Sequence, residues 1–174
     1  MVKKLKLNLG CGDDIRSGFK NVDLTSPSKR VMAYDLNQLP LPFGDDSVDY
    51  IHCEHMLSYL DEPADFLHDL HRICKSGARI KLIVNHFSLA MSYGELRKKR
   101  SGFSYFTFGE HYWNDELFDK FRVEKKYMNF TRINYTWLNK IFNPFINKFP
   151  VFYERMLCYM IPASEIIFDL EVTK

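Results

Sequence analysis

A chain of 174 residues with 46% hydrophobic and 26% charged residues has the size and composition of one globular domain. Its formal net charge of +2 is close to neutral, so we expect no DNA partner and disfavour RNA. The four cysteines lie far apart in the sequence without a Cys-x-x-Cys pair, which argues against a structural zinc site or a disulfide scaffold.

The N-terminus carries no pattern of a secretory signal. Lys3 and Lys4 make it basic, but no long apolar stretch follows them. The sequence also lacks the run of about 18 apolar residues that a transmembrane helix needs. We therefore expect a cytoplasmic protein with reduced thiols and no transmembrane segment.

The first half of the chain has the pattern of an α/β domain. Strands are expected at residues 5–9, 21–24, 30–36, 47–53 and 78–84, and an amphipathic helix is expected over residues 63–75, capped by Gly77. Strands that alternate with crossovers indicate a parallel sheet. The connection from Asp13 to Lys20 is an exception, because it is too short for the usual crossover helix.

The second half differs in its surface chemistry. Residues 1–86 hold 6 of the 27 aromatic residues and residues 87–174 hold 21. The sequence predicts helices over residues 88–100 and 114–121, a loop or lid over 102–113, strands over 123–133 and 166–172, and helical spacing over 137–160 that is broken at Pro144 and Pro150. We expect a single domain, residues 1–174, with a cofactor-binding half (1–86) and a substrate-facing half (87–174).

A glycine turn follows the first strand. Gly10 and Gly12 permit positive φ and leave room for a ligand near the backbone. The next two strands end in Asp23 and Asp35, and the ends of neighbouring parallel strands share one crevice. A carboxylate there can accept hydrogen bonds from a ribose diol, and a second can accept one from an exocyclic amine such as that of adenine. No lysine, serine or threonine follows at phosphate-loop spacing, so nucleoside triphosphates are disfavoured.

The motifs of residues 5–85, taken in order, resemble those of class I S-adenosylmethionine-dependent methyltransferases, in the small-molecule, type 11-like subgroup. The resemblance rests on Leu7-Asn8-Leu9-Gly10-Cys11-Gly12, Asn21-Val22-Asp23-Leu24, Asp35 to Phe43, Asp46 to Ile51, Cys53 to Leu57 and Leu70 to Gly77. It implies a Rossmann-like methyltransferase fold with a central, mostly parallel seven-stranded sheet, an antiparallel last strand and helices on both faces.

The resemblance also implies which residues bind S-adenosyl-L-methionine. They are Gly10, Cys11 and Gly12 around the methionine moiety, Asp23 and Leu24 at the ribose, Asp35 and Leu36 at the adenine, and Cys53 and Glu54 flanking the methionine part. Two departures stand out. The helix between the first two strands has no room, which leaves the ribose side less covered, and Ser76-Gly77-Ala78 stands where the family has Pro-Gly-Gly.

Methyl transfer needs alignment and a group that removes the acceptor's proton. His55, His86 and His111 are the candidates, each weighed against a purely structural role. His68, His71 and Cys74 have a spacing that metal ligands can show, but Cys74 belongs to the buried stripe of its helix and the histidines point away from it. We therefore expect no metal.

The sequence thus predicts a methyltransferase that acts on the oxygen or nitrogen of a small-molecule or sugar-type acceptor. One alternative is an RNA or protein methyltransferase, which the basic run from Arg97 to Arg100 supports. A second alternative is a catalytically silent S-adenosylmethionine-binding partner subunit. A nicotinamide oxidoreductase is disfavoured because the third glycine of the dinucleotide motif is missing. The aromatic half could form the acceptor pocket, a peripheral membrane contact, a homodimer interface or ordinary core.

Overall fold

The computed structural model describes residues 4–26, 28–99, 102–108, 117 and 119–174. Its elements include seven strands, β1 (Lys6–Leu9), β2 (Lys20–Asp23), β3 (Val31–Ala33), β4 (Val48–Glu54), β5 (Cys74–Asn85), β6 (Phe121–Asn129) and β7 (Glu165–Val172). The helical elements are α1 (Pro63–Ile73), α3 (Asn139–Lys148), α4 (Pro150–Phe152), the 3-10 turns η1 (Leu57–Tyr59), η2 (Ala90–Gly94) and η3 (Thr136–Leu138), and a π-helical turn η4 (Tyr153–Leu157).

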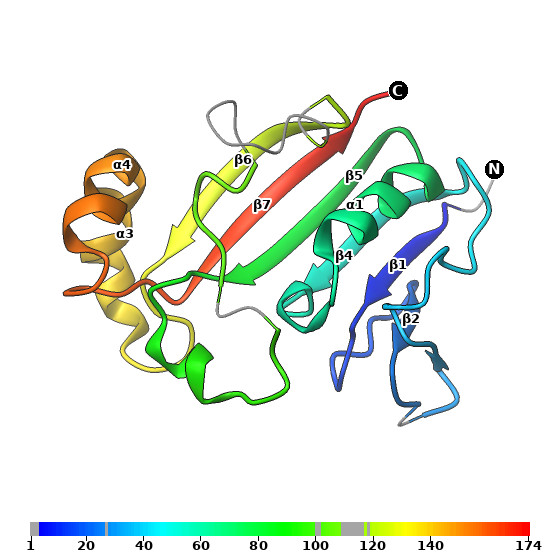
Figure 1. The fold of residues 1–174 in the computed structure, drawn as a ribbon, viewed down its shortest axis with the longest axis horizontal. Coiled ribbons are helices and arrows are strands. Elements are labelled where there is room, and N and C mark those ends of the chain that lie inside the picture. The colour runs from blue at the N-terminus through cyan, green and yellow to red at the C-terminus, as the bar shows by residue number, and fades with distance from the viewer. Residues whose placement is uncertain (1–3, 27, 100–101, 109–116, 118) are drawn as a thin grey trace.

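All seven strands form one sheet in the order β3-β2-β1-β4-β5-β7-β6 (Figure 1). The strands β1 to β5 pair in parallel, with Leu9 opposite both Val22 and Cys53. β7 runs antiparallel to β5 and β6. The predicted fold class, including the antiparallel last strand, is confirmed.

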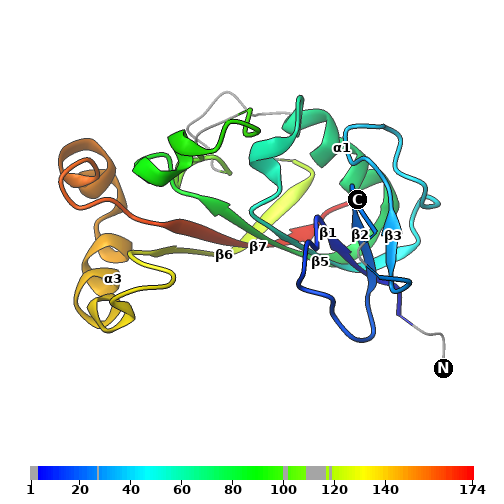
Figure 2. The same cartoon turned by 90° about the horizontal axis from the view of Figure 1, so that it is seen from below.

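The helices lie unevenly around the sheet. Figure 2 shows α1 on one side of the sheet and α3 on the other side, at the end formed by β6 and β7. The face of α1 that contains Phe66, Leu70 and Ile73 is buried, because its apolar residues recur every three or four positions. Together with alternate residues of the strands it forms one apolar core.

The loop after β1 contains no helix, as its length predicted. Two buried asparagines hold it instead: Asn8 donates to the carbonyl of Asp14 (2.7 Å), and Asn21 accepts from the backbone N–H of Arg16 (2.9 Å). The two side chains also bond each other at 3.1 Å. Side-chain amides thus satisfy the loop's backbone groups where helical hydrogen bonds would otherwise do so.

Several predicted boundaries were wrong. The helix α1 ends at Ile73 and β5 begins at Cys74, so Gly77, at a φ of 75°, lies within the strand and does not cap the helix. The strand expected over 30–36 is only Val31–Ala33, because the Asp35 carboxylate bonds the backbone N–H of Asn37 (3.0 Å) and turns the chain.

In the second half, the helix expected over 88–100 is mostly irregular and contains only the short turn η2, with Arg100 outside the described residues. Just before this segment, His86 forms a β-bridge with Phe103, which keeps the backbone extended. The expected break at Pro144 is also wrong, since this exposed proline lies inside α3, where water can bond the carbonyl that it leaves free. For the helix expected over 114–121, half of the residues lie outside the described part, and Phe121 begins β6.

Candidate active site

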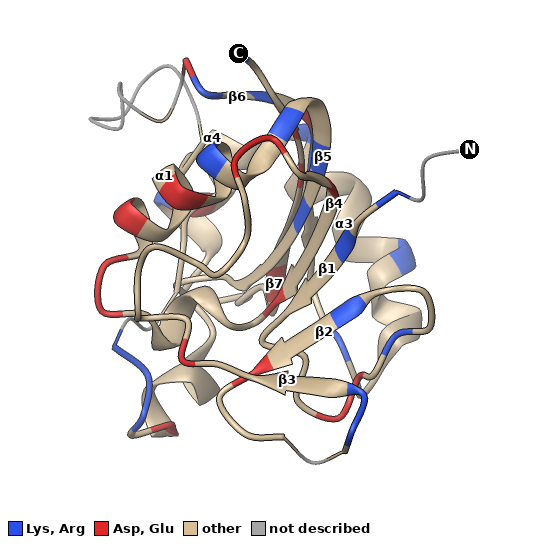
Figure 3. Cartoon of the chain, turned by 90° about the vertical axis from the view of Figure 1, so that its right-hand side faces the viewer, with Lys and Arg blue, Asp and Glu red and all other residues tan. Residues whose placement is uncertain are grey.

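A cavity of about 490 Å³ opens at the carboxyl ends of β1, β2 and β4. This is the edge where open α/β sheets bind ligands, and the volume suits a small-molecule ligand. Figure 3 shows acidic residues at the tip of β2 and basic residues at the opposite ends of β1 and β2. The cavity is lined by Gly10, Gly12, Asp23, Leu24, Asp35, Leu36, Asn37, Glu54, His55, Met56, Tyr59, Leu60 and Arg97.

The glycine turn shapes the floor of this cavity. Gly10 and Gly12 have φ angles of 67° and 48°, a region that side chains disfavour. A Cβ on Gly10 would lie 2.3 Å from Cγ of Met56, so this glycine is needed for close packing. A Cβ on Gly12 would meet no atom within 4 Å, which leaves its backbone open to a ligand.

Both predicted acids face the cavity and are already positioned by backbone groups. Asp23 accepts a hydrogen bond from the N–H of Gly12 at 2.8 Å and one from Thr25 at 3.3 Å. Asp35 uses its Oδ1 to accept from the N–H of Asn37. Because these bonds fix the carboxylates, a polyhydroxylated ligand would meet acceptors in defined places.

His55 directly follows β4 and lines the cavity with a side chain that is 16% exposed. Its φ of 53° is unusual for a residue with a side chain and is held by the bond from its N–H to the carbonyl of Ile83 (2.7 Å). The ring Nε2 lies 3.1 Å from Oε2 of Glu165. Neither ring nitrogen has an aligned hydrogen-bond partner within the described residues.

Glu165, the first residue of β7, is a site residue that the sequence did not reveal. Burial alone would raise the pKa of this carboxyl, but His55, the amide of Asn129 and the cation of Arg132 hold the pKa below its usual range. Asn129 donates to it at 2.8 Å. Glu165 thus places a buried carboxylate directly beside the ring of His55.

Glu54 is surrounded by cations. Arg132 lies 3.1 Å from its Oε1, and Arg16 lies 3.7 Å from its Oε2. Arg132 comes from the chain after β6 and Arg16 from the loop after β1, so Glu54 joins two segments that are distant in sequence. Nothing in the local sequence around Arg132 signals this contact, because it arises from the order of the strands in the sheet.

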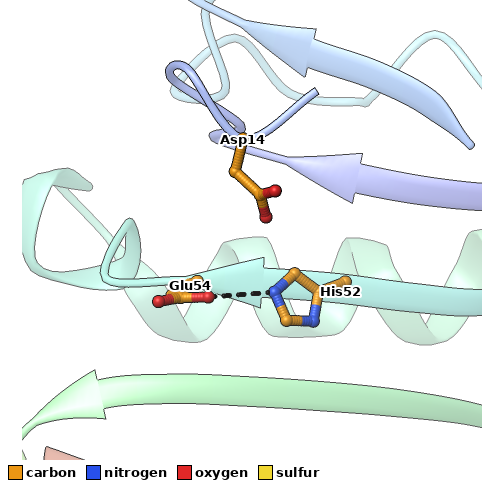
Figure 4. A group of neighbouring side chains, drawn as sticks. All are labelled: Asp14, His52 and Glu54. Atoms are coloured by element: carbon orange, nitrogen blue, oxygen red, sulfur yellow. Dashed lines mark hydrogen bonds and ion pairs between the residues drawn. The ribbon is translucent and has the colours of Figure 1, made fainter. Parts of the chain in front are cut away.

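The side chains of Asp14, His52 and Glu54 gather on one side of β4 (Figure 4), with one ligand-type atom of each within 4.8 Å of the others. The cation in this group is Arg16, whose Nε bonds Asp14 at 2.6 Å. Burial, followed by the charge of Arg16, lowers the pKa of His52 despite the opposing effect of Glu54. A guanidinium that already balances the two carboxylates leaves these side chains with little need for a metal ion.

The remaining predicted site residues lie elsewhere. Cys11 and Cys53 are buried and do not line the cavity, and burial raises the pKa of both thiols. His86 is fully buried away from the cavity, with Nδ1 2.8 Å from the Ser88 hydroxyl and Nε2 3.3 Å from Glu154. His111 lies outside the described residues.

Five residues of the cavity wall were not predicted: Asn37, Met56, Tyr59, Leu60 and Arg97. Asn37 and Met56 lie within motifs that carry the resemblance, and Tyr59 and Leu60 follow one of them closely, so the motifs contained a signal for these four. Arg97 is different, because the irregular segment after η2 brings it to the cavity from a distant part of the sequence.

Comparison with known proteins agrees with this geometry. Residues 14–82 match the model of a family described as methyltransferase domain. No curated protein sequence matches the chain.

Among solved structures, a protein from Listeria monocytogenes described as an S-adenosylmethionine-dependent methyltransferase has a TM-score of 0.61 at 12% identity, over 99% of this chain and 92% of that chain. An S-adenosylmethionine-dependent methyltransferase from Mesorhizobium loti gives 0.59 at 13%, over 96% and 90%. A chain from the complex between the Haloferax volcanii Trm112 methyltransferase activator and a protein described as a methyltransferase gives 0.55 at 16%, over 98% and 83%.

Residues 14–82 therefore resemble a methyltransferase domain, and the chain shares its fold with these S-adenosylmethionine-dependent methyltransferases.

Proposed function

We propose that this protein transfers a methyl group from S-adenosylmethionine to an oxygen or nitrogen atom of a small-molecule or sugar-type acceptor. The observation that carries the proposal is the single cavity that joins the glycine turn, Asp23, Asp35 and His55. Residues 1–174 act as one domain in this proposal, with the donor held by the first half and the acceptor reached from the second.

The cavity fits the donor. The open backbone at Gly12 suits close approach of a methionine moiety, and the two fixed carboxylates suit the ribose hydroxyls and the adenine amine. Asp23 would bind the ribose and Asp35 the adenine edge, beside Leu36. The donor supplies a methyl group activated by its sulfonium, so the protein has to provide alignment and proton removal.

His55 is the residue that we propose for proton removal. Of the two predicted histidines in the described residues, it is the one that lines the cavity. Glu165, 3.1 Å from its ring, would orient the ring and stabilise the charge that the ring gains with the acceptor's proton. Glu165 is thus a positioning residue and His55 the general base.

Donor binding tests the first part of the proposal. Calorimetric titration should show binding of S-adenosylmethionine and S-adenosylhomocysteine and none of NAD. Asp23→Ala should weaken donor binding by more than about 1.5 kcal/mol, because it removes charge-assisted hydrogen bonds. Asp13→Ala, which changes an acid of the same turn outside the cavity wall, is the matched control. Absence of binding by both sulfur ligands would overturn the proposal.

Turnover tests the second part. His55→Ala should retain donor affinity and lower turnover by about 100-fold or more. Glu165→Gln should shift the pH profile of turnover without a change in donor affinity, which a merely structural role would not produce. His68→Ala, on α1, serves as a control. Unchanged turnover in His55→Ala would leave proton removal to solvent.

A catalytically silent subunit is the second candidate, since a structural neighbour occurs in a complex with a methyltransferase activator. That candidate predicts no methyl transfer by the isolated chain and recovery when a partner chain is added. An RNA acceptor would instead reveal itself through a steep dependence of acceptor binding on salt concentration.

A further inference from the structure

The helix α3 has its polar side turned inward. Asn139, Asn143 and Asn147 recur every four residues and face the end of β6. Asn143 accepts from the N–H of Phe130 (2.8 Å), and Asn147 bonds both the N–H and the carbonyl of Met128 (2.7 and 2.8 Å). Asn139 likewise accepts from the N–H of Thr131 (2.9 Å) and donates to its carbonyl (2.8 Å). The attachment of α3 therefore rests largely on amide hydrogen bonds, with Ile146 as its buried apolar residue.

The apolar side of the same helix faces solvent. Ile141 and Phe145 lie on this side, and Trp137 of η3 and Phe149, directly after α3, continue the spacing of four residues; Trp137 and Ile141 are 60% and 59% exposed. Phe152 of α4 and Met156 of η4 are also exposed. We call the surface formed by these six side chains the aromatic end of the molecule. A soluble monomer rarely leaves so continuous an apolar surface uncovered.

The charges around the aromatic end have one sign. Residues 130–163 contain four basic residues, Arg132, Lys140, Lys148 and Arg155, and one acid, Glu154. Glu154 is turned inward, where it accepts bonds from the Ser104 hydroxyl (2.7 Å) and the N–H of Tyr105 (2.6 Å). Arg132 is paired with Glu54 (3.1 Å), so Lys140, Lys148 and Arg155 give this segment its exposed positive charge.

We propose that the aromatic end binds the surface of an anionic lipid bilayer, with the face of α3 that carries Ile141 and Phe145 inserted at the headgroup level. Outward aromatic side chains flanked by lysine and arginine are the features that hold a helix in that plane. No helix in the described part of the chain is long and apolar enough to cross a membrane, so the contact is peripheral.

A second copy of the chain fits this surface less well. A twofold dimer through the aromatic end would bring Lys140 and Lys148 toward the same residues of the other copy. The segment offers no exposed carboxylate to pair with them, because its one acid, Glu154, is turned inward and bonded to Ser104 and Tyr105. An anionic bilayer, in contrast, satisfies both the apolar and the basic parts of the surface.

Vesicle co-sedimentation tests the proposal directly. The full chain should bind vesicles of equal parts phosphatidylcholine and phosphatidylglycerol and should not bind vesicles of phosphatidylcholine alone. The double variant Lys140→Glu, Lys148→Glu should lower vesicle affinity by more than about tenfold. The matched control Lys6→Glu, Lys20→Glu reverses two charges at the far end of β1 and β2 and should bind as the unaltered chain does.

Tryptophan fluorescence reports whether Trp137 enters the bilayer. In the background Trp113→Phe, Trp137 is the single tryptophan, and its emission should shift to shorter wavelength when anionic vesicles are added. Ile141→Ser should reduce that shift without changing the thermal unfolding of the protein. Absence of vesicle binding overturns the proposal. If light scattering shows a dimer that Ile141→Ser converts to a monomer, the surface binds a second copy and the proposal is overturned. If the Lys6→Glu, Lys20→Glu control loses as much vesicle binding as the Lys140→Glu, Lys148→Glu variant, the assignment of binding to the aromatic end is overturned.

Discussion

The helices α1 and α3 are both amphipathic, yet they face the sheet with opposite sides. α1 buries Phe66 and Leu70, at 1% and 0% exposure, whereas α3 buries Asn143 and leaves Ile141 59% exposed. The difference shows that periodicity alone establishes that a helix has two faces and not which of them is inward. On α1 the inward face is selected by the hydrophobic effect, and on α3 by the hydrogen-bonding needs of β6.

The largest expected effect separates the two apolar faces. Leu70→Ala should lower the free energy of unfolding by about 2–5 kcal/mol, because it leaves a cavity in the core. Phe145→Ala, on the exposed side of α3, should lower it by less than about 1 kcal/mol. Urea unfolding of both variants measures the two values. Equal losses would show that the outward face of α3 is covered in solution.

The next effect concerns the asparagines. Asn143→Ala should cost about 1–3 kcal/mol of unfolding free energy, since it leaves the N–H of Phe130 without its bond in a part-buried position. Asn134→Ala, at an exposed position of the preceding loop, should be close to neutral. Similar values for both substitutions would mean that α3 is held by its few apolar contacts.

The smallest effect is a dependence on pH. Because folding lowers the pKa of His52 below 6.5, the unfolded chain binds more protons as the pH falls through that value. The stability contributed by the neutral, buried ring is therefore complete above pH 6.5 and is lost as the pH falls toward the lowered value. The amides of α3 do not titrate, so their contribution stays constant.

Unfolding curves recorded at several pH values can check this contrast. His52→Gln should flatten the decline of stability below pH 6.5, and Asn143→Ala should shift the whole curve without a change of slope. An unaltered slope in His52→Gln would contradict the lowered pKa.

The fold of the first half was predictable because each element carries its own signal. The strand–glycine–acid pattern around Gly10 and Asp23 and the apolar stripe of α1 depend on neighbouring residues in the sequence. In the second half, the positions of α3 and of Arg97 depend on contacts with distant segments. For that reason the segment over 88–100 was wrongly expected to be helical.

The candidate site divides in the same way. The predicted donor-binding positions follow local motifs, and the structure places Gly10, Gly12, Asp23 and Asp35 around one cavity. The proposed partner of His55, in contrast, is Glu165, which is 110 residues further along the chain and arrives because β7 inserts between β5 and β6. Glu54 was predicted from its motif, whereas nothing in the sequence around Glu165 singled it out before its contact with His55 was known.

The amides that attach α3 have a consequence for protein solubility. An edge strand presents unpaired backbone groups on which another chain can add, which is how sheets aggregate. At the end of β6 the amides of Asn143 and Asn147 occupy such groups, and exposed charges at Arg122, Glu124 and Lys125 follow along the rest of this edge. The opposite edge, β3, is only three residues long. Both edges are therefore poor templates, so the protein should resist edge-to-edge aggregation even when it is concentrated.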